Sequence, residues 1–250
     1  MLAREVRILF RKELHQLLRN KGALLTALFL PVLLMLIVPM AQILGVKLDQ
    51  PNELPIPPEV SLPPGLAEVG KDPLVVVRLL LTPLISMGGL LTPALLANHT
   101  FISERESRTL ELLVALPVRV GQILQAKLLA ILVLSAPVCL GLFAVVAGFM
   151  LSRGVGSPGY VLVMAVMVAA SLAFSCSTAL FVSLLAQDIR TASNLTGLVL
   201  SPFVIGGFVV MAMVPGTTLA SAVLAGAFLL GTAVVLVLAL RVVTFERMLR

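Results

Sequence analysis

The chain has 250 residues, of which 59% are hydrophobic and 12% are charged, and its mean hydropathy is +1.11. Soluble domains have about 45–50% apolar and about 25% charged residues, so these values exclude a soluble protein and indicate an integral membrane protein. The net charge of +6 does not indicate a nucleic-acid partner, because Trp is absent and Tyr160 is the only tyrosine that could stack on a base.

Residues 1–22 have the pattern of a basic amphipathic helix. Arg4, Arg7, Arg11, His15 and Arg19 lie at steps of three or four residues, and Lys12 adds a further cation. We expect this helix to lie in the membrane interface, where the same charges also fix the topology. The apolar residues expected on its other side are Val6, Leu9, Phe10, Leu14, Leu17 and Leu18.

The first predicted span is 23–45, an apolar run long enough to cross about 30 Å of hydrocarbon at about 1.5 Å per residue. It is too long for the core of a signal peptide, so we expect an uncleaved span. Residues 46–73 contain seven prolines, which favour extended chain and predict a short extracellular loop without a core of its own. Residues 23–250 therefore form a single transmembrane domain.

The second predicted span is 74–98. Arg78 lies one turn inside its outer end, where a long side chain reaches the headgroups, and we favour this interpretation over a role in substrate binding. Gly88, Gly89 and Pro93 are expected to loosen the helix or to let another helix approach closely.

Residues 101–127 form a charged interruption between apolar segments. Glu104, Arg105, Glu106 and Arg108 stand close together, and each charge near the bilayer centre costs about 2.5–3.5 kcal/mol, so this stretch lies outside the hydrocarbon. Ser103 and Glu106 have the spacing of a capping box, which predicts that a short amphipathic helix begins there and that Pro117 ends it. An ordinary loop helix lying on the headgroups is an equally good interpretation of this pattern alone.

Four further spans are expected at about 128–151, 160–186, 195–214 and 217–240, which makes six. The fourth span has a small residue at every fourth position (Ser171, Ser175, Ala179 and Ser183), a pattern typical of helix packing in membranes. Residues 187–194 predict a polar hinge, in which Ser193 or Asn194 caps the fifth span. Pro215 and Gly216 predict a tight hairpin between the last two spans.

The distribution of cations predicts the orientation. Placing both termini in the cytoplasm puts 14 of the 18 Lys and Arg residues on that side. The positive-inside rule therefore predicts cytoplasmic N- and C-termini and a cytoplasmic 101–127 segment, as six spans require.

The sequence lacks the residue sets of several membrane enzymes. His15 and His99 are the only histidines, and no H-E-x-x-H, G-x-S-x-G or phosphate-binding G-x-x-x-x-G-K-[ST] motif occurs. We therefore expect neither a catalytic residue nor a metal site, and no cofactor bound by this chain. Cys139 and Cys176 lie in apolar runs and are expected to be buried thiols. The scarcity of ionisable groups in the spans also disfavours an ion-coupled pump.

The charged interruption and its neighbours resemble the corresponding segment of the ABC type-2 transporter permeases. The resemblance extends over most of the chain, from the basic N-terminal helix to the short Arg-rich tail. The matching residues are Arg11–Leu14, Pro31, Glu104–Glu106, Thr109–Leu113, Leu116–Val118, Lys127–Leu128 and Asp188–Ala192.

This resemblance implies the permease subunit of an ATP-driven ABC exporter in the cell (inner or plasma) membrane. It implies a pair of permeases, a second copy or a homologue, with two separate ATP-binding subunits that hold the ATP and Mg. Residues 101–117 would be the coupling helix that docks on the ATPase, and the substrate would pass between the two permeases along the second and fifth spans. The implied coupling residues are Ser103, Glu104, Arg105, Glu106, Arg108, Thr109, Glu111 and Pro117, and the polar candidates for the pathway are Thr82, Ser86, Thr92, Asn194 and Ser201.

The apolar pathway favours a hydrophobic or amphiphilic substrate. Two alternatives remain: an ATP-independent channel or ion-coupled carrier, and an intramembrane enzyme or assembly scaffold. Transport without an ATPase would support the first, and activity of the purified chain on a lipid or peptide would support the second.

Overall fold

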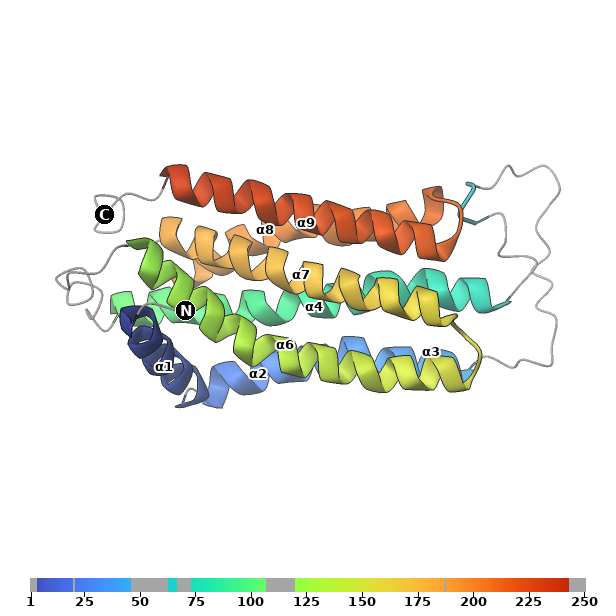
Figure 1. The fold of residues 1–250 in the computed structure, drawn as a ribbon, viewed down its shortest axis with the longest axis horizontal. Helices are drawn as coiled ribbons and strands as arrows, with labels where there is room; N and C mark the ends of the chain where they lie inside the picture. Colours follow the sequence, from blue (N-terminus) through green and yellow to red (C-terminus); the bar gives the residue numbers. More distant parts are fainter. Residues whose placement is uncertain are drawn as a thin grey trace.

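The computed structural model describes residues 4–19, 21–45, 63–66, 73–106, 120–186 and 188–242. All elements in these ranges are helical (Figure 1), which confirms the predicted all-α class. The helices are α1 (Arg4–Arg19), α2 (Lys21–Pro31), the π-helix η1 (Val32–Ile37), α3 (Val38–Gly45), α4 (Pro73–Glu106), α6 (Val120–Ser152), α7 (Pro158–Leu185), α8 (Ile189–Met213) and α9 (Thr217–Val242).

Six helical segments in the described ranges are long and apolar enough to cross a membrane, as predicted. They are Ala27–Gly45, Leu74–Ala97, Gln125–Ser152, Pro158–Ser183, Arg190–Met213 and Thr217–Ala239. The chain is therefore a multi-pass membrane protein.

The first span is one continuous rod made of three segments, α2, η1 and α3. Pro31 ends α2 and the π-helical turn follows it at once. Proline lacks an N–H and its ring clashes with the carbonyl four residues earlier, so a wider turn next to it relieves the misfit. The π-helix carries the buried Met35, which packs toward α4 at Gly88.

Helices α4 and α7 form the centre of the bundle. Each has 61% of its span buried, against 17% in α9. Helix α9 packs mainly on α7 and α8 mainly on α4, while α2 and α6 cover the other side of the pair (Figure 1). The predicted tight turn between α8 and α9 is present at Gly216, whose φ is +81°, but α9 packs mainly on α7 and not on α8.

Small residues bring α4 and α7 together, as predicted. All four members of the Ser171–Ser183 stripe are buried, and Ser175 Oγ donates to the carbonyl of Leu90 on α4. A Cβ atom at Gly89 would collide with Ser171 Oγ, so this position needs glycine for the close approach.

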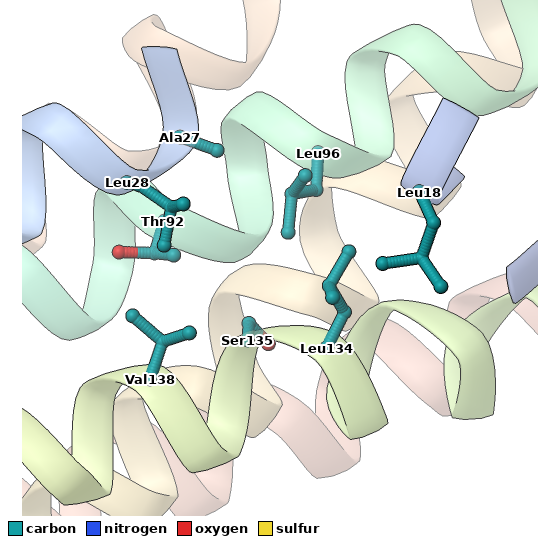
Figure 2. Close-up of a pocket in the computed structure, with 8 residues that line it drawn as sticks. All are labelled: Leu18, Ala27, Leu28, Thr92, Leu96, Leu134, Ser135 and Val138. Carbon is teal, nitrogen blue, oxygen red and sulfur yellow. The ribbon is translucent and has the colours of Figure 1, made fainter. Parts of the chain in front are cut away.

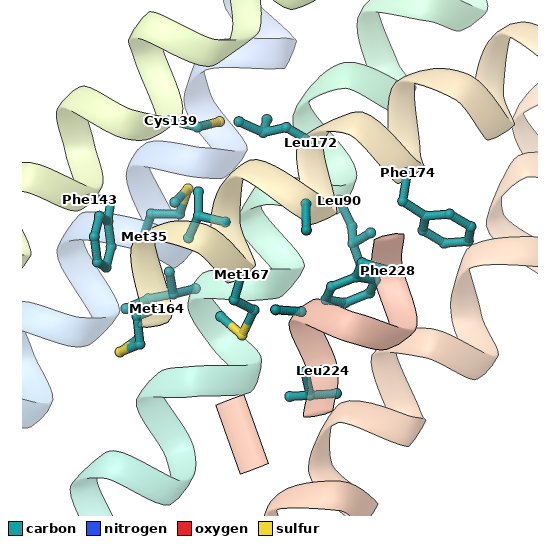
Figure 3. Close-up of a cluster of buried hydrophobic side chains, with 14 of the residues drawn as sticks. Met35, Leu90, Cys139, Phe143, Met164, Met167, Leu172, Phe174, Leu224 and Phe228 are labelled. Carbon is teal, nitrogen blue, oxygen red and sulfur yellow. The ribbon is translucent and has the colours of Figure 1, made fainter. Parts of the chain in front are cut away.

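Aromatic and sulfur-containing side chains fill the space around this contact (Figure 3). Phe174 of α7 lies with its ring centroid 4.4 Å from that of Phe203 on α8 and 6.0 Å from that of Phe228 on α9. Offset aromatic contacts of this kind join the three helices. Cys139 and Cys176 are both buried free thiols.

Helix α1, the end of α4, the start of α6 and the end of α9 lie at one end of the bundle (Figure 1). We call this the α1 end. At the opposite end, Arg78 Nε donates to the carbonyl of Val155 in the α6–α7 turn, and Tyr160 Oη lies 2.7 Å from Thr82 Oγ1. Arg78 thus holds a turn of its own chain. There too, Gly65 N donates to Ala212 O at 3.0 Å, which fixes the described part of the proline-rich segment on α8.

Candidate functional site

The four coupling candidates at the N-terminal side of the charged segment lie in the last turns of α4. Ser103 does not begin a helix, so the predicted capping box is wrong: α4 runs without a break from Pro73 to Glu106. No Gly or Pro interrupts residues 97–106, so the helix simply continues out of the apolar span. At the helical rise, Glu106 lies about 13 Å beyond Ala97 along the axis. Helix α4 therefore carries charged residues well past the apolar part of the bundle.

The other coupling candidates, Arg108, Thr109, Glu111 and Pro117, lie outside the described residues. The chain resumes at Val120, where α6 begins. In the sequence, residues 107–119 connect the end of α4 to the start of α6.

The start of α6 packs against α1. Val6 and Leu9 of α1 form a small buried cluster with Ile123 and Ala126 of α6, and Phe10 packs against it. This cluster is separate from the main core of the bundle. The apolar face of α1 is therefore covered by protein, and α1 and the first turns of α6 form one packed unit.

A buried ion pair lies next to this cluster. Lys127 Nζ of α6 is 2.9 Å from Glu13 Oε2 of α1, and the two side chains are 1% and 3% exposed. The second carboxylate oxygen, Oε1, is 3.7 Å from Lys12 Nζ, whose side chain is 43% exposed. Charges removed from water in this way attract strongly, and removing either partner leaves the other buried without its counter-charge. The pair therefore holds α1 to α6 in a defined register.

The sequence contained a weak signal for this pair. Glu13 stands four residues from Leu9 and from Leu17, so it lies on the apolar face of its helix. Lys127 likewise stands in an apolar stretch between Ala126 and Leu128. A charge on an apolar face needs a partner, but 114 positions separate these two in the chain, and the sequence pattern does not pair them.

The outer face of α1 is basic, as predicted. Arg7, Arg11 and Lys12 are all exposed, and the side chain of Arg4 lies outside the described ones. Leu18 differs from the prediction: it is 51% exposed and lies on the basic face. The reason is angular, since Leu18 follows Arg11 by seven residues, which is almost two full turns.

The pathway candidates divide into two groups. Thr82, Ser86 and Thr92 of α4 are buried inside the bundle, and each hydroxyl donates to a carbonyl of its own helix. Asn194 and Ser201 of α8 are exposed. The structure thus does not bring the five together on one surface of the chain.

The start of α8 also differs from the prediction. Asp188 is the N-cap, and its carboxylate accepts from the N–H of Thr191 at 2.6 Å. That hydrogen bond lowers the pKa of Asp188 below its ordinary value. Asn194, expected as a possible cap, lies inside the helix.

Comparison with protein families agrees with this architecture. The family model described as "ABC-2 type transporter" matches residues 4–217, from the first residue of α1 to the first residue of α9. No curated protein matches the chain significantly.

Proposed function

This chain belongs to the ABC-2 type transporter family, and it is a membrane-spanning transport subunit; from this we propose that it is the permease of an ATP-driven exporter. The observation that carries the proposal is the continuity of α4, which runs in one piece from the centre of the bundle into the charged segment. A helix connected in this way transmits a push at its end to the packed core.

We place the ATPase on separate subunits, two for each pair of permeases, which hold the ATP and Mg. Glu104, Arg105 and Glu106 at the end of α4, with Arg108, Thr109 and Glu111 beyond it, offer charges of both signs to a polar partner surface. Such groups form charge-assisted hydrogen bonds across an interface. The α1–α6 unit supports the other end of the same segment.

The orientation follows from the cations. The α1 end carries most of the Lys and Arg residues, so the positive-inside rule places it, with both termini, in the cytoplasm of a cell that keeps this protein in its inner or plasma membrane. A docking segment at this end then faces the cytoplasmic ATPase.

The route that we propose for the substrate lies between two permeases, this chain and a second copy or homologue. The exposed Asn194 and Ser201 on α8 are the pathway candidates that face outward from this chain. Exposed residues around them on α8, such as Leu198, are apolar, which favours a hydrophobic or amphiphilic substrate. The buried Thr82, Ser86 and Thr92 would reach it only after α4 moves.

Charge reversal at the docking segment tests the proposal. The triple variant E104K/E106K/E111K should insert normally, but it should no longer co-purify with an ATP-binding subunit from the native membrane. ATP-dependent uptake of an amphiphile into inside-out vesicles should fall at least about tenfold, since like charges placed across an interface cost several kcal/mol.

The matched control reverses three glutamates in the segment between α3 and α4, as E53K/E59K/E68K, and changes the net charge equally. It should retain both the partner and transport. An unchanged yield of complex from the first variant would refute docking there. Transport by the purified chain alone, without ATP, would support the channel or ion-coupled carrier instead.

A further inference from the structure

A groove opens between α1, α2, α4 and α6 at the α1 end of the bundle (Figure 2). Its volume is about 130 Å³, and its walls are Leu18, Ala27, Leu28, Thr92, Leu96, Leu134, Ser135 and Val138. Leu18 at its rim is half exposed, whereas Ala27, Thr92 and Leu96 line its floor and are buried. The groove is therefore open on one side.

The surface that the groove presents to a ligand is apolar. Its two hydroxyls are bonded to their own helices, Thr92 Oγ1 to Gly88 O and Ser135 Oγ to Ile131 O, each at 2.8 Å. Cavities lined only by apolar groups stay dry and bind apolar molecules, and a cavity of about 150 Å³ holds a benzene-sized ligand. A helix from another chain, about 10–12 Å wide, is too large for this space. The groove fits a few carbons of an acyl chain.

Basic residues of α1 lie near Leu18 at the rim of the groove. Leu18 lies on the same face of α1 as Arg11 and His15, at helical steps of seven and three residues, and Arg19 follows it directly. Arg11, His15 and Arg19 are all exposed. At the helical rise, these side chains start within about 11 Å of Leu18 along the axis. One face of α1 thus presents positive charge beside the mouth of an apolar slot.

We propose that this groove and the cationic face of α1 bind one anionic phospholipid. The end of an acyl chain enters the groove past Leu18, and Arg11 and Arg19 bind the phosphate of the headgroup. Guanidinium groups suit this role because they bind phosphate oxygens through paired hydrogen bonds. The site needs only this chain and a bilayer, so it stands or falls independently of the ATPase partner and the direction of transport.

The absence of Trp from the chain allows a direct test. Leu18→Trp places a single fluorophore at the rim, where a half-exposed side chain tolerates the larger ring. The full chain is reconstituted in vesicles with dibrominated phosphatidylglycerol or dibrominated phosphatidylcholine of the same acyl chains, and quenching is measured against mole fraction. The anionic lipid should bind at Leu18→Trp at least about fivefold more strongly, the factor expected for one cation near an anionic surface.

Two sets of controls separate this site from ordinary lipid contact. Leu230→Trp, at an exposed apolar position of α9, should be quenched equally by the two lipids. In the Leu18→Trp background, R11Q/R19Q should abolish the preference, whereas R190Q/R241Q, which also removes two exposed cations, should keep it.

The acyl chain is tested by filling the groove. Val138→Phe in the Leu18→Trp background should lower quenching by the anionic lipid, with circular dichroism confirming the fold. Equal quenching by both lipids at Leu18→Trp, or a preference that survives R11Q/R19Q, would overturn the proposal. Undiminished quenching in Val138→Phe would show that the acyl chain does not enter the groove, and an absence of quenching by either lipid would also overturn the proposal.

Discussion

The buried pair between Glu13 and Lys127 yields the sharpest energetic prediction. At 2.9 Å and an effective dielectric constant of about 20, their Coulomb attraction is about 6 kcal/mol. Desolvation of two charges opposes most of this attraction, so the net contribution of the intact pair is small. Lys127→Met removes the attraction and leaves the carboxylate of Glu13 buried. We expect this variant to lose about 3–5 kcal/mol of unfolding free energy.

The chain contains a matched control for this change. Lys12 faces the other oxygen of the same carboxylate, but at 3.7 Å and with a 43% exposed side chain. Lys12→Met should therefore cost less than about 1 kcal/mol. The double variant Glu13→Leu/Lys127→Met, which replaces both charges by apolar groups, should lie within about 1 kcal/mol of the unmodified chain.

Unfolding in mixed micelles, followed by circular dichroism as dodecyl sulfate is added, measures these three variants and the single variant Glu13→Leu, which completes the cycle. The reasoning requires a strongly non-additive cycle, because each single change strands a charge that the double change removes. Equal losses in Lys127→Met and Lys12→Met, or a double variant as unstable as the sum of its singles, would refute it.

Two further predictions concern helix packing and a helix cap. Gly89→Ala should cost about 1–3 kcal/mol, since its Cβ meets Ser171 Oγ, whereas Gly148→Ala, with no neighbouring atom within 4 Å, should gain about 0.5–1 kcal/mol in the same unfolding assay. Because the pKa of Asp188 is lowered in the folded chain, its charged carboxylate stabilises α8 at pH values above its ordinary pKa of 3.8, and this contribution is lost as the pH falls through the folded pKa. Asp188→Asn should keep the cap but remove this contribution from the difference in unfolding free energy between pH 7 and pH 3.

The spans were predictable because the bilayer itself fixes their length and their apolar character. The same constraint does not say where a helix ends once it leaves the apolar layer. Ser103 and Glu106 match a capping box, but the motif also fits inside a helix, and no break precedes it. The N-cap at Asp188 was not predicted for a related reason. Several polar residues there are good caps, and which of them caps α8 depends on where α7 ends.

Contacts between distant parts of the chain were the least predictable features. Composition alone does not tell that α9 packs on α7, since every face of α9 is apolar enough for lipid or protein. Glu13 and Lys127 each stand among apolar residues in the sequence, but only the packing of α1 on α6 brings the two charges together. Leu18 follows Leu17 directly, but one position along a helix rotates the side chain by about 100°, which turns Leu18 onto the basic face.

These contacts also show how the parts of the α1 end depend on one another. Leu18 of α1 and Leu134, Ser135 and Val138 of α6 line one side of the groove, whereas residues of α2 and α4, which pack on each other, line the other. The groove thus lies between α1 and α6 on one side and α2 and α4 on the other, and in the sequence residues 107–119 connect α4 to α6. We expect a movement of α6 relative to α4 to change the width of the groove, since the two helices form opposite walls. A lipid that binds one width more tightly then favours the corresponding state of the segment, and by linkage that state binds the lipid more tightly. Lipid binding at the proposed site and docking at the proposed segment would then both depend on the same movement of α6 relative to α4.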